Sequence, residues 1–236
     1  MSLVDHLEEL RTRLLRVGIA LAIGMVLGIV FAKPIYRLLA LPMHEALGGA
    51  GFFIATDPIE AFMTYMKTGF VAGLFLAVPF IFYELWSFVA PALFAYEKRR
   101  SLFFVSITTF FFVGGALFGY FVVFPSSFQF FSNLLNDTGI RLLPKMSEYF
   151  SFAVRLLLAF GIVFELPVLL LLLARIGVVN AAMLSKARPY CIVGVFVIGG
   201  VMTGPDVPSQ LMMAIPLWIL FEGSIVLARV FGKQKE

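Results

Sequence analysis

Three carboxylates in this chain could do chemistry because they lie inside or directly beside long apolar segments. Glu9 precedes the first apolar segment, Glu97 follows the second, and Glu165 interrupts the fourth. A carboxylate can accept a proton or pair with a cationic group, and a charged group deep in a bilayer costs about 2.5–3.5 kcal/mol to insert. Acidic residues at such positions usually mark function, so we consider each in turn.

Glu9 lies on a predicted amphipathic helix at the start of the chain. Four leucines follow the 3, 4 spacing of one helical face: Leu3, Leu7, Leu10 and Leu14. We expect this helix to lie on the cytoplasmic surface and to continue into the first membrane span. By spacing alone, Glu9 is predicted to form an i,i+4 ion pair with Arg13, worth a few tenths of a kcal/mol.

Glu97 ends the segment that follows the second apolar run and is followed at once by Lys98, Arg99 and Arg100. Spacing alone favours a solvated charge cluster that anchors the next span. The alternative is an acidic group that receives a cationic partner, with Phe88 and nearby aromatic residues as an apolar floor.

Glu165 lies in the fourth apolar run, two residues before Pro167. A proline at this position removes one amide donor and leaves the carbonyl of Val163 without its helical partner, so we expect a kink beside Glu165. Two interpretations stay open. Glu165 is either a protonated acid bonded to the freed carbonyl or a functional group that faces the bundle interior.

The elements that must position these groups are membrane spans. Hydrophobic residues make up 61% of the 236 residues and charged residues 14%, and the mean hydropathy is +0.99. We therefore predict an all-α integral membrane protein with one polytopic domain over residues 1–236. Its six expected spans are about residues 14–32, 68–88, 101–124, 150–174, 190–203 and 211–230. The fifth has 14 residues, or about 21 Å against a core of about 30 Å. We expect a short span that thins the bilayer, and the alternative is a buried or re-entrant segment.

The distribution of lysine and arginine predicts the orientation. With both termini in the cytoplasm, 12 of the 18 Lys and Arg residues are cytoplasmic and 5 are on the other side, which fits the positive-inside rule. The two long non-cytoplasmic loops, about residues 33–67 and 125–149, are expected to contain short helices. Lys33-Pro34 is expected to end the first span and Pro125 the third.

Other features point away from enzymes and metal proteins. His44-Glu45 lacks the second histidine of a zinc-protease motif, and the single Cys191 excludes an internal disulfide and a multi-cysteine metal site. We therefore expect no metal and no cofactor. We also expect no nucleic-acid partner, since the net charge of +4 is explained by the excess of Lys and Arg on the cytoplasmic side of a membrane protein. Glu84 and Glu222 are expected to snorkel to the cytoplasmic interface, and Asp206 to cap the last helix.

Four motifs, in order along nearly the whole chain, resemble the TatC family, the multispanning component of the twin-arginine protein translocase. They are HLEELRTRL at 6–14, FVAPALFAYEKR at 88–99, FGIVFELP at 160–167 and PDVPSQ at 205–210. The resemblance implies six transmembrane helices in a curved, glove-like bundle with the N- and C-termini inside. It also implies a location in the inner membrane of a bacterium and a role in transporting folded proteins that carry twin-arginine signal peptides.

The resemblance assigns roles by motif position. Glu9 and Glu97 would bind the paired arginines, with Phe88 beside them. Arg11 and Arg13 match basic positions of the first motif and would belong to the same signal-peptide-binding site. Glu165 would be the polar residue on the concave membrane face.

Partners of the TatA and TatB type, which have a single span, would dock near Thr203, Asp206 and Gln210. A receptor complex with several copies of the chain is also expected.

Two residues depart from the family pattern, Glu84 in place of the usual glutamine and Gly204 in place of a proline. The alternative function is an ion-coupled secondary transporter of small solutes that uses Glu165, although the absence of an internal repeat weakens it. An intramembrane enzyme is a further alternative, which no motif supports.

Overall fold

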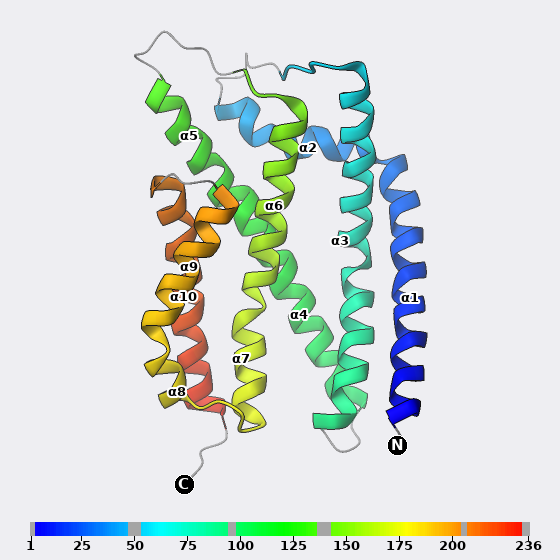
Figure 1. Ribbon diagram of the computed structural model, residues 1–236, viewed down its shortest axis with the longest axis vertical. Helices are drawn as coiled ribbons and strands as arrows, with labels where there is room; N and C mark the ends of the chain where they lie inside the picture. The colour runs from blue at the N-terminus through cyan, green and yellow to red at the C-terminus, as the bar shows by residue number, and fades with distance from the viewer. Residues whose placement is uncertain (1–2, 47–52, 94–97, 136–142, 204–206, 233–236) are drawn as a thin grey trace. The chain divides into compact units, whose positions relative to one another are not determined.

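The computed structural model describes residues 3–46, 53–93, 98–135, 143–203 and 207–232. These residues form helices, and their only extended pairing is an isolated bridge between Ile54 and Lys145. In chain order the helices are α1 (Leu3–Val30), α2 (Ala32–Ala46), α3 (Pro58–Leu93), α4 (Lys98–Phe118), the π-helical turn η1 (Gly119–Val123), α5 (Phe124–Leu135), α6 (Met146–Phe164), α7 (Leu166–Arg175), α8 (Ala181–Lys186), α9 (Arg188–Thr203) and α10 (Val207–Phe231) (Figure 1).

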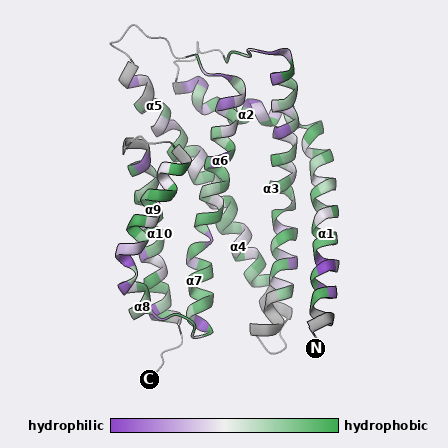
Figure 2. Ribbon diagram, in the orientation of Figure 1, coloured by the Kyte–Doolittle hydropathy of each residue, from purple (hydrophilic) through white to green (hydrophobic). Residues whose placement is uncertain are grey.

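Five segments of the described chain are long and apolar enough to cross a membrane: Leu7–Val30, Pro58–Phe88, Leu102–Phe130, Met146–Arg175 and Met213–Val230. A sixth apolar segment, Arg188–Val201, is shorter, which agrees with the short fifth span of the sequence prediction. Hydrophobic residues predominate along these helices (Figure 2). Large apolar side chains also point outward, including Val30 at 71%, Phe110 at 74% and Val201 at 74% exposure. The all-α membrane class is therefore confirmed, because apolar surface of this extent is typical of a protein in a bilayer.

The chain divides into two compact units, and the first contains residues 1–41, 53–109 and 144–150. In this unit α1 and α3 lie side by side and run in opposite directions (Figure 1). Their backbones touch at glycines. A Cβ atom added at Gly24 would lie 2.5 Å from the carbonyl oxygen of Gly73, and one added at Gly69 would lie 2.6 Å from Cγ1 of Ile29. Small residues at these positions let the two helices approach closely, as in other membrane bundles.

Side chains tie the start of α3 to the start of α6, within the same unit. The carboxylate of Glu60 accepts hydrogen bonds from the amides of Thr56 (2.8 Å) and Ser147 (3.0 Å). Tyr149 donates its hydroxyl hydrogen to the carbonyl of Leu39 on α2. The helix in the first long loop is thereby fixed against α3, and the prediction of a short helix there is confirmed.

The second unit contains residues 42–52, 110–143 and 151–236, and its core is aromatic where α4 meets α6. Glycine makes room for rings on both helices, since a Cβ atom at Gly115 would meet the carbonyl oxygen of Phe160 at 2.5 Å and one at Gly161 would meet Phe112 at 2.9 Å. A second cluster joins α7, α8 and α10 through Ala174, Leu184, Phe221, Ile225 and Ala228. Packing in this unit thus combines small residues with large ones.

The first span ends at Val30, close to its predicted end, but helical structure resumes at once at both proline signals. The backbone turns at Phe31 and α2 starts at once, with Pro34 in its first turn and the amide of Ile35 bonded to the carbonyl of Phe31 (3.1 Å). Pro125 lies in the first turn of α5, directly after the π-helical turn η1. In both places the proline falls where the amide hydrogen is not needed, so helical structure resumes around it.

Candidate functional site

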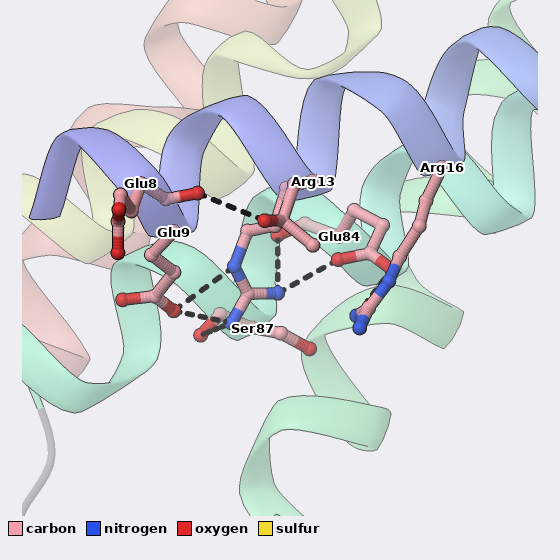
Figure 3. Close-up of polar contacts among 7 residues, drawn as sticks. Glu8, Glu9, Arg13, Arg16, Glu84 and Ser87 are labelled. Atoms are coloured by element: carbon pink, nitrogen blue, oxygen red, sulfur yellow. Dashed lines mark hydrogen bonds and ion pairs between the residues drawn. The ribbon is translucent and has the colours of Figure 1, made fainter. Parts of the chain in front are cut away.

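The start of α1 and the end of α3 meet in a cluster of acidic and basic side chains in the first unit (Figure 3). Glu9, Arg13 and Arg16 come from α1, and Glu84 and Ser87 come from α3. The antiparallel contact of the two helices brings these ends together, because the glycine crossing holds the helices close along their length.

Arg13 is the centre of the cluster and uses all five of its N–H groups. Its Nε (3.0 Å) and Nη2 (2.6 Å) donate to Oε1 of Glu9, and its Nη1 donates to Oε2 of Glu84 (2.8 Å). Longer bonds run from Nη1 to the carbonyl of Glu84 (3.4 Å) and from Nη2 to the carbonyl of Ser87 (3.2 Å). With its donors satisfied and its side chain 18% exposed, Arg13 links α1 to α3.

Glu84 is buried, with 3% of the residue exposed, and it pairs with both Arg13 (2.8 Å) and Arg16 (3.6 Å). The expectation that Glu84 snorkels to the interface is therefore wrong. The physical reason is that the guanidinium groups of Arg13 and Arg16 on α1 pair with the Glu84 carboxylate inside the contact between α1 and α3, so the side chain does not need to extend to the interface. A buried carboxylate is retained only with such partners.

Glu9 forms the predicted i,i+4 pair with Arg13, and it keeps an outward side. Its side chain is 31% exposed, and both bonds from Arg13 end on the same oxygen, Oε1. Figure 3 shows the second oxygen turned away from Arg13. A carboxylate held in this way still has an oxygen that can accept a hydrogen bond from another group.

The remaining residues assigned to this region are only partly within the described chain. Arg11 is exposed on α1, and Phe88 lies half-buried near the end of α3. Glu97 lies outside the described residues, four positions beyond the last residue of α3, Leu93. Sequence reasoning found Glu9 and Arg13 but missed the roles of Glu84 and Arg16. The sequence signal that could have indicated their pairing is that Arg16 and Glu84 carry opposite charges near the ends of two consecutive predicted spans.

Glu165 stands at a break between two helices of the second unit. α6 ends at Phe164 and α7 begins at Leu166 with Pro167 in its first turn, so the predicted kink is confirmed. The amide of Glu165 bonds to the carbonyl of Ile162 at 3.1 Å. Its Oε1 is buried and has no hydrogen-bond partner among the described residues. An acid with an unsatisfied buried oxygen fits a functional group better than a fully bonded plug.

The turn between α9 and α10 holds the residues expected to dock partners. Gln210 donates from Nε2 to the carbonyl of Phe196 on α9 (2.5 Å) and lies against Gly199 and Gly200. Thr203 is the last residue of α9, although its side chain is not among those described, and Asp206 lies outside the described residues. Gln210 therefore joins the two helices that border the turn.

Glu222 also differs from its expectation. It accepts two hydrogen bonds from Arg188 on α9, at 2.7 Å and 2.8 Å, instead of only reaching for the interface. This pair ties α9 to α10 toward the ends away from the turn. Elsewhere in the described chain, no three or more His, Cys, Asp or Glu side chains gather into a potential metal site.

Comparison with known proteins agrees with the four motifs. Residues 5–216 match the sequence model of the family described as Sec-independent protein translocase protein (TatC). The chain belongs to the TatC family. The Sec-independent protein translocase protein TatC of Desulforapulum autotrophicum is 47% identical over 98% of this chain and 86% of its own. The protein of the same name from Escherichia coli K12 is 40% identical over 99% of this chain and 92% of its own.

Solved structures agree as well. A crystal structure described as the twin-arginine translocase receptor TatC matches with a TM-score of 0.84 at 38% identity, covering 94% of this chain and 97% of that one. A second, in the detergent DDM, gives a TM-score of 0.87 at 36% identity and covers 97% of this chain and all of that one. The chain is a TatC subunit of the twin-arginine, Sec-independent protein translocase in the bacterial inner membrane, and it is not an enzyme. Nothing in these similarities supports the alternative of an ion-coupled solute transporter.

Proposed function

We propose that this TatC chain binds the two arginines of a twin-arginine signal peptide with the carboxylates of Glu9 and Glu97, at the cytoplasmic end of α1 and α3. The observation that supports the proposal best is the state of Glu9. One of its oxygens is held by Arg13 and the other is turned away, on a side chain that is 31% exposed. An arginine of the peptide can donate to that second oxygen without displacing Arg13.

The reach of the chain allows Glu97 to take part. Glu97 is four positions after Leu93, the last residue of α3, and a chain of four residues spans at most about 14 Å. Glu97 therefore stays near the end of α3, where Phe88 supplies an aromatic surface. Phe88 would remove water from the pairs, because an exposed ion pair contributes only about 0–1 kcal/mol.

The geometry of guanidinium explains why arginine would be read specifically. A planar guanidinium donates two parallel hydrogen bonds to a carboxylate, and the ammonium group of lysine cannot reproduce this fork. Two carboxylates on one surface would read two arginines. Arg11 is exposed on the same helix and, being a cation, would interact with acidic groups of the peptide or with lipid head groups instead.

Crosslinking of a twin-arginine peptide tests the proposed site. A photoreactive residue at Phe88, or at Lys98 next to Glu97, should capture the peptide, and one at Phe62, which is 59% exposed near the opposite end of α3, should not. A twin-lysine peptide should crosslink much less at both sites. Equal capture at Phe62 and Phe88 would contradict the proposal.

We also propose that single-span partners of the TatA and TatB type dock at the turn between α9 and α10, and that several copies of the chain assemble in the receptor complex. Thr203, Asp206 and Gln210 are close in sequence at this turn, and the side-chain amide of Gln210 donates a hydrogen bond to the carbonyl of Phe196 on α9. The outward apolar residues Val201 and Leu211 flank it and would face a partner helix. A crosslinker at Val201 should capture a single-span partner, and one at Val230 should not.

A further inference from the structure

Arg13 cannot itself be a ligand of the peptide. Its five N–H groups already donate to Glu9, Glu84 and the carbonyl of Ser87, and its charge repels an incoming guanidinium. The resemblance to the family places Arg13 among the residues that bind the peptide. The contacts point to a different role, in which Arg13 holds Glu9.

The charge of the cluster depends on Glu84. Glu9 and Glu84 carry two negative charges, and Arg13 and Arg16 carry two positive charges, so the four side chains together are neutral. Without the charge of Glu84, the cluster would hold two guanidinium groups and one carboxylate, that of Glu9. An arginine from the peptide would then approach a site that carries a net positive charge.

The position of Glu84 strengthens its effect. It is 3% exposed and lies within 2.8 Å of Arg13 and 3.6 Å of Arg16. Buried charges are screened less by salt and water than exposed ones. Glu84 also holds the Nη1 end of Arg13, so that Nε and Nη2 face Oε1 of Glu9.

We propose that Glu84 is a positioning residue for signal-peptide recognition: through Arg13 it fixes the carboxylate of Glu9 with one oxygen outward, and it offsets the charge of Arg13 and Arg16 so that this oxygen attracts a guanidinium. The inference rests on the proposed role of Glu9. It makes the glutamate at position 84, where the family pattern has glutamine, a determinant of the affinity of this chain.

The test is a double-mutant cycle on peptide affinity, measured with the purified full chain in detergent and a fluorescent twin-arginine peptide. Glu84→Gln keeps the size of the side chain and removes its charge, and we expect it to weaken binding by roughly three- to tenfold. Glu84→Asp keeps the charge and should restore most of the loss. In the Glu9→Gln background, Glu84→Gln should have almost no further effect, because Glu84 acts through Glu9.

Two control variants separate this mechanism from a general charge effect. Glu8→Gln removes the same charge from the exposed residue next to Glu9, and Glu60→Gln removes it from α3 about 36 Å along the helix from Glu84. Both should change affinity by less than about twofold. If Glu8→Gln weakened binding as much as Glu84→Gln, the effect would be one of overall charge and the inference would be wrong.

The cycle also separates this inference from the proposed function. If Glu9→Gln left affinity unchanged, the proposed role of Glu9 itself would fail. If Glu9→Gln weakened binding while Glu84→Gln did not, or if the two effects simply added, only the role of Glu84 would fail. Should Glu84→Gln not fold, Arg13→Lys carries the same test, because lysine keeps the charge but cannot hold Glu9, Glu84 and Ser87 together.

Discussion

Replacing Gly24 with alanine should loosen the contact that aligns α1 with α3. The new methyl carbon would lie 2.5 Å from the carbonyl oxygen of Gly73 and 3.2 Å from its Cα and carbonyl carbon. The closest atoms are backbone, so no side chain can rotate away. To bring the first distance to 3.0 Å the helices must separate by at least 0.5 Å.

The expected cost follows from forced separation of a close-packed interface. Overpacking of this kind typically costs about 1–3 kcal/mol, and contacts between small residues are a main source of helix association in a bilayer. For a chain of this size that corresponds to a fall in melting temperature on the order of 2–12 °C. Gly24 lies 11 residues after Arg13, and Gly73 lies 11 residues before Glu84, so the same shift should weaken the Arg13–Glu84 pair.

The assay is thermal stability in detergent, read as the fraction of chain that stays monodisperse after heating. Gly18→Ala is the matched control on the same helix, because nothing lies within 4 Å of a Cβ atom at Gly18. It should be neutral or stabilising, since alanine favours helix by about 1 kcal/mol over glycine. If Gly24→Ala were as stable as Gly18→Ala, the close crossing of α1 and α3 would not be what aligns the charged cluster.

Three further predictions concern the second unit. Glu165→Ala should leave binding of a twin-arginine peptide nearly unchanged and should slow transport of folded cargo, because this acid, with its buried oxygen, lies at the α6–α7 break. Loss of peptide binding by a folded variant would contradict this division of roles. Spin labels at Ile192 and Val201 should both report a depth near the membrane interface, because the 16 residues of α9 reach only about 24 Å. Labels found at the centre of the hydrocarbon core would contradict thinning of the bilayer. Glu222→Gln should lower the melting temperature by removing the partner of Arg188, and Arg188→Gln should add little to it, whereas fully additive losses would mean that the pair does not act as a unit.

The spans were predictable because the bilayer imposes a length and a composition on each one. Long apolar runs interrupted by clustered charge indicated where the apolar helices lie, although α3 begins at Pro58, ten residues before the expected start of the second span. Pro167 predicted the kink beside Glu165. Pro125 misled the expected end of the third span, since a proline in a first turn does not stop a helix. Whether a proline opens or ends a helix depends on neighbouring residues that satisfy the backbone, and the sequence pattern does not reveal them.

The charged cluster was only half predictable. The pair of Glu9 and Arg13 follows from helical spacing alone, because both residues lie on one helix. The pairing of Glu84 with Arg13 depends on the register between α1 and α3, which contacts such as that of Gly24 with Gly73 set. Arg188 and Glu222 illustrate the same limit, since their pairing depends on how α9 lies against α10.

The most direct test of the proposed recognition site is the preference for arginine over lysine. Affinities of twin-arginine and twin-lysine peptides should be measured in detergent for the wild type, Glu9→Gln, Glu97→Gln and the double variant. Each single substitution should weaken binding of the arginine peptide by about 1.5–3 kcal/mol, the range for hydrogen bonds to charged groups. The double variant should bind the two peptides almost equally. If the double variant still preferred arginine as strongly as the wild type does, Glu9 and Glu97 would be structural and the arginines would be read elsewhere.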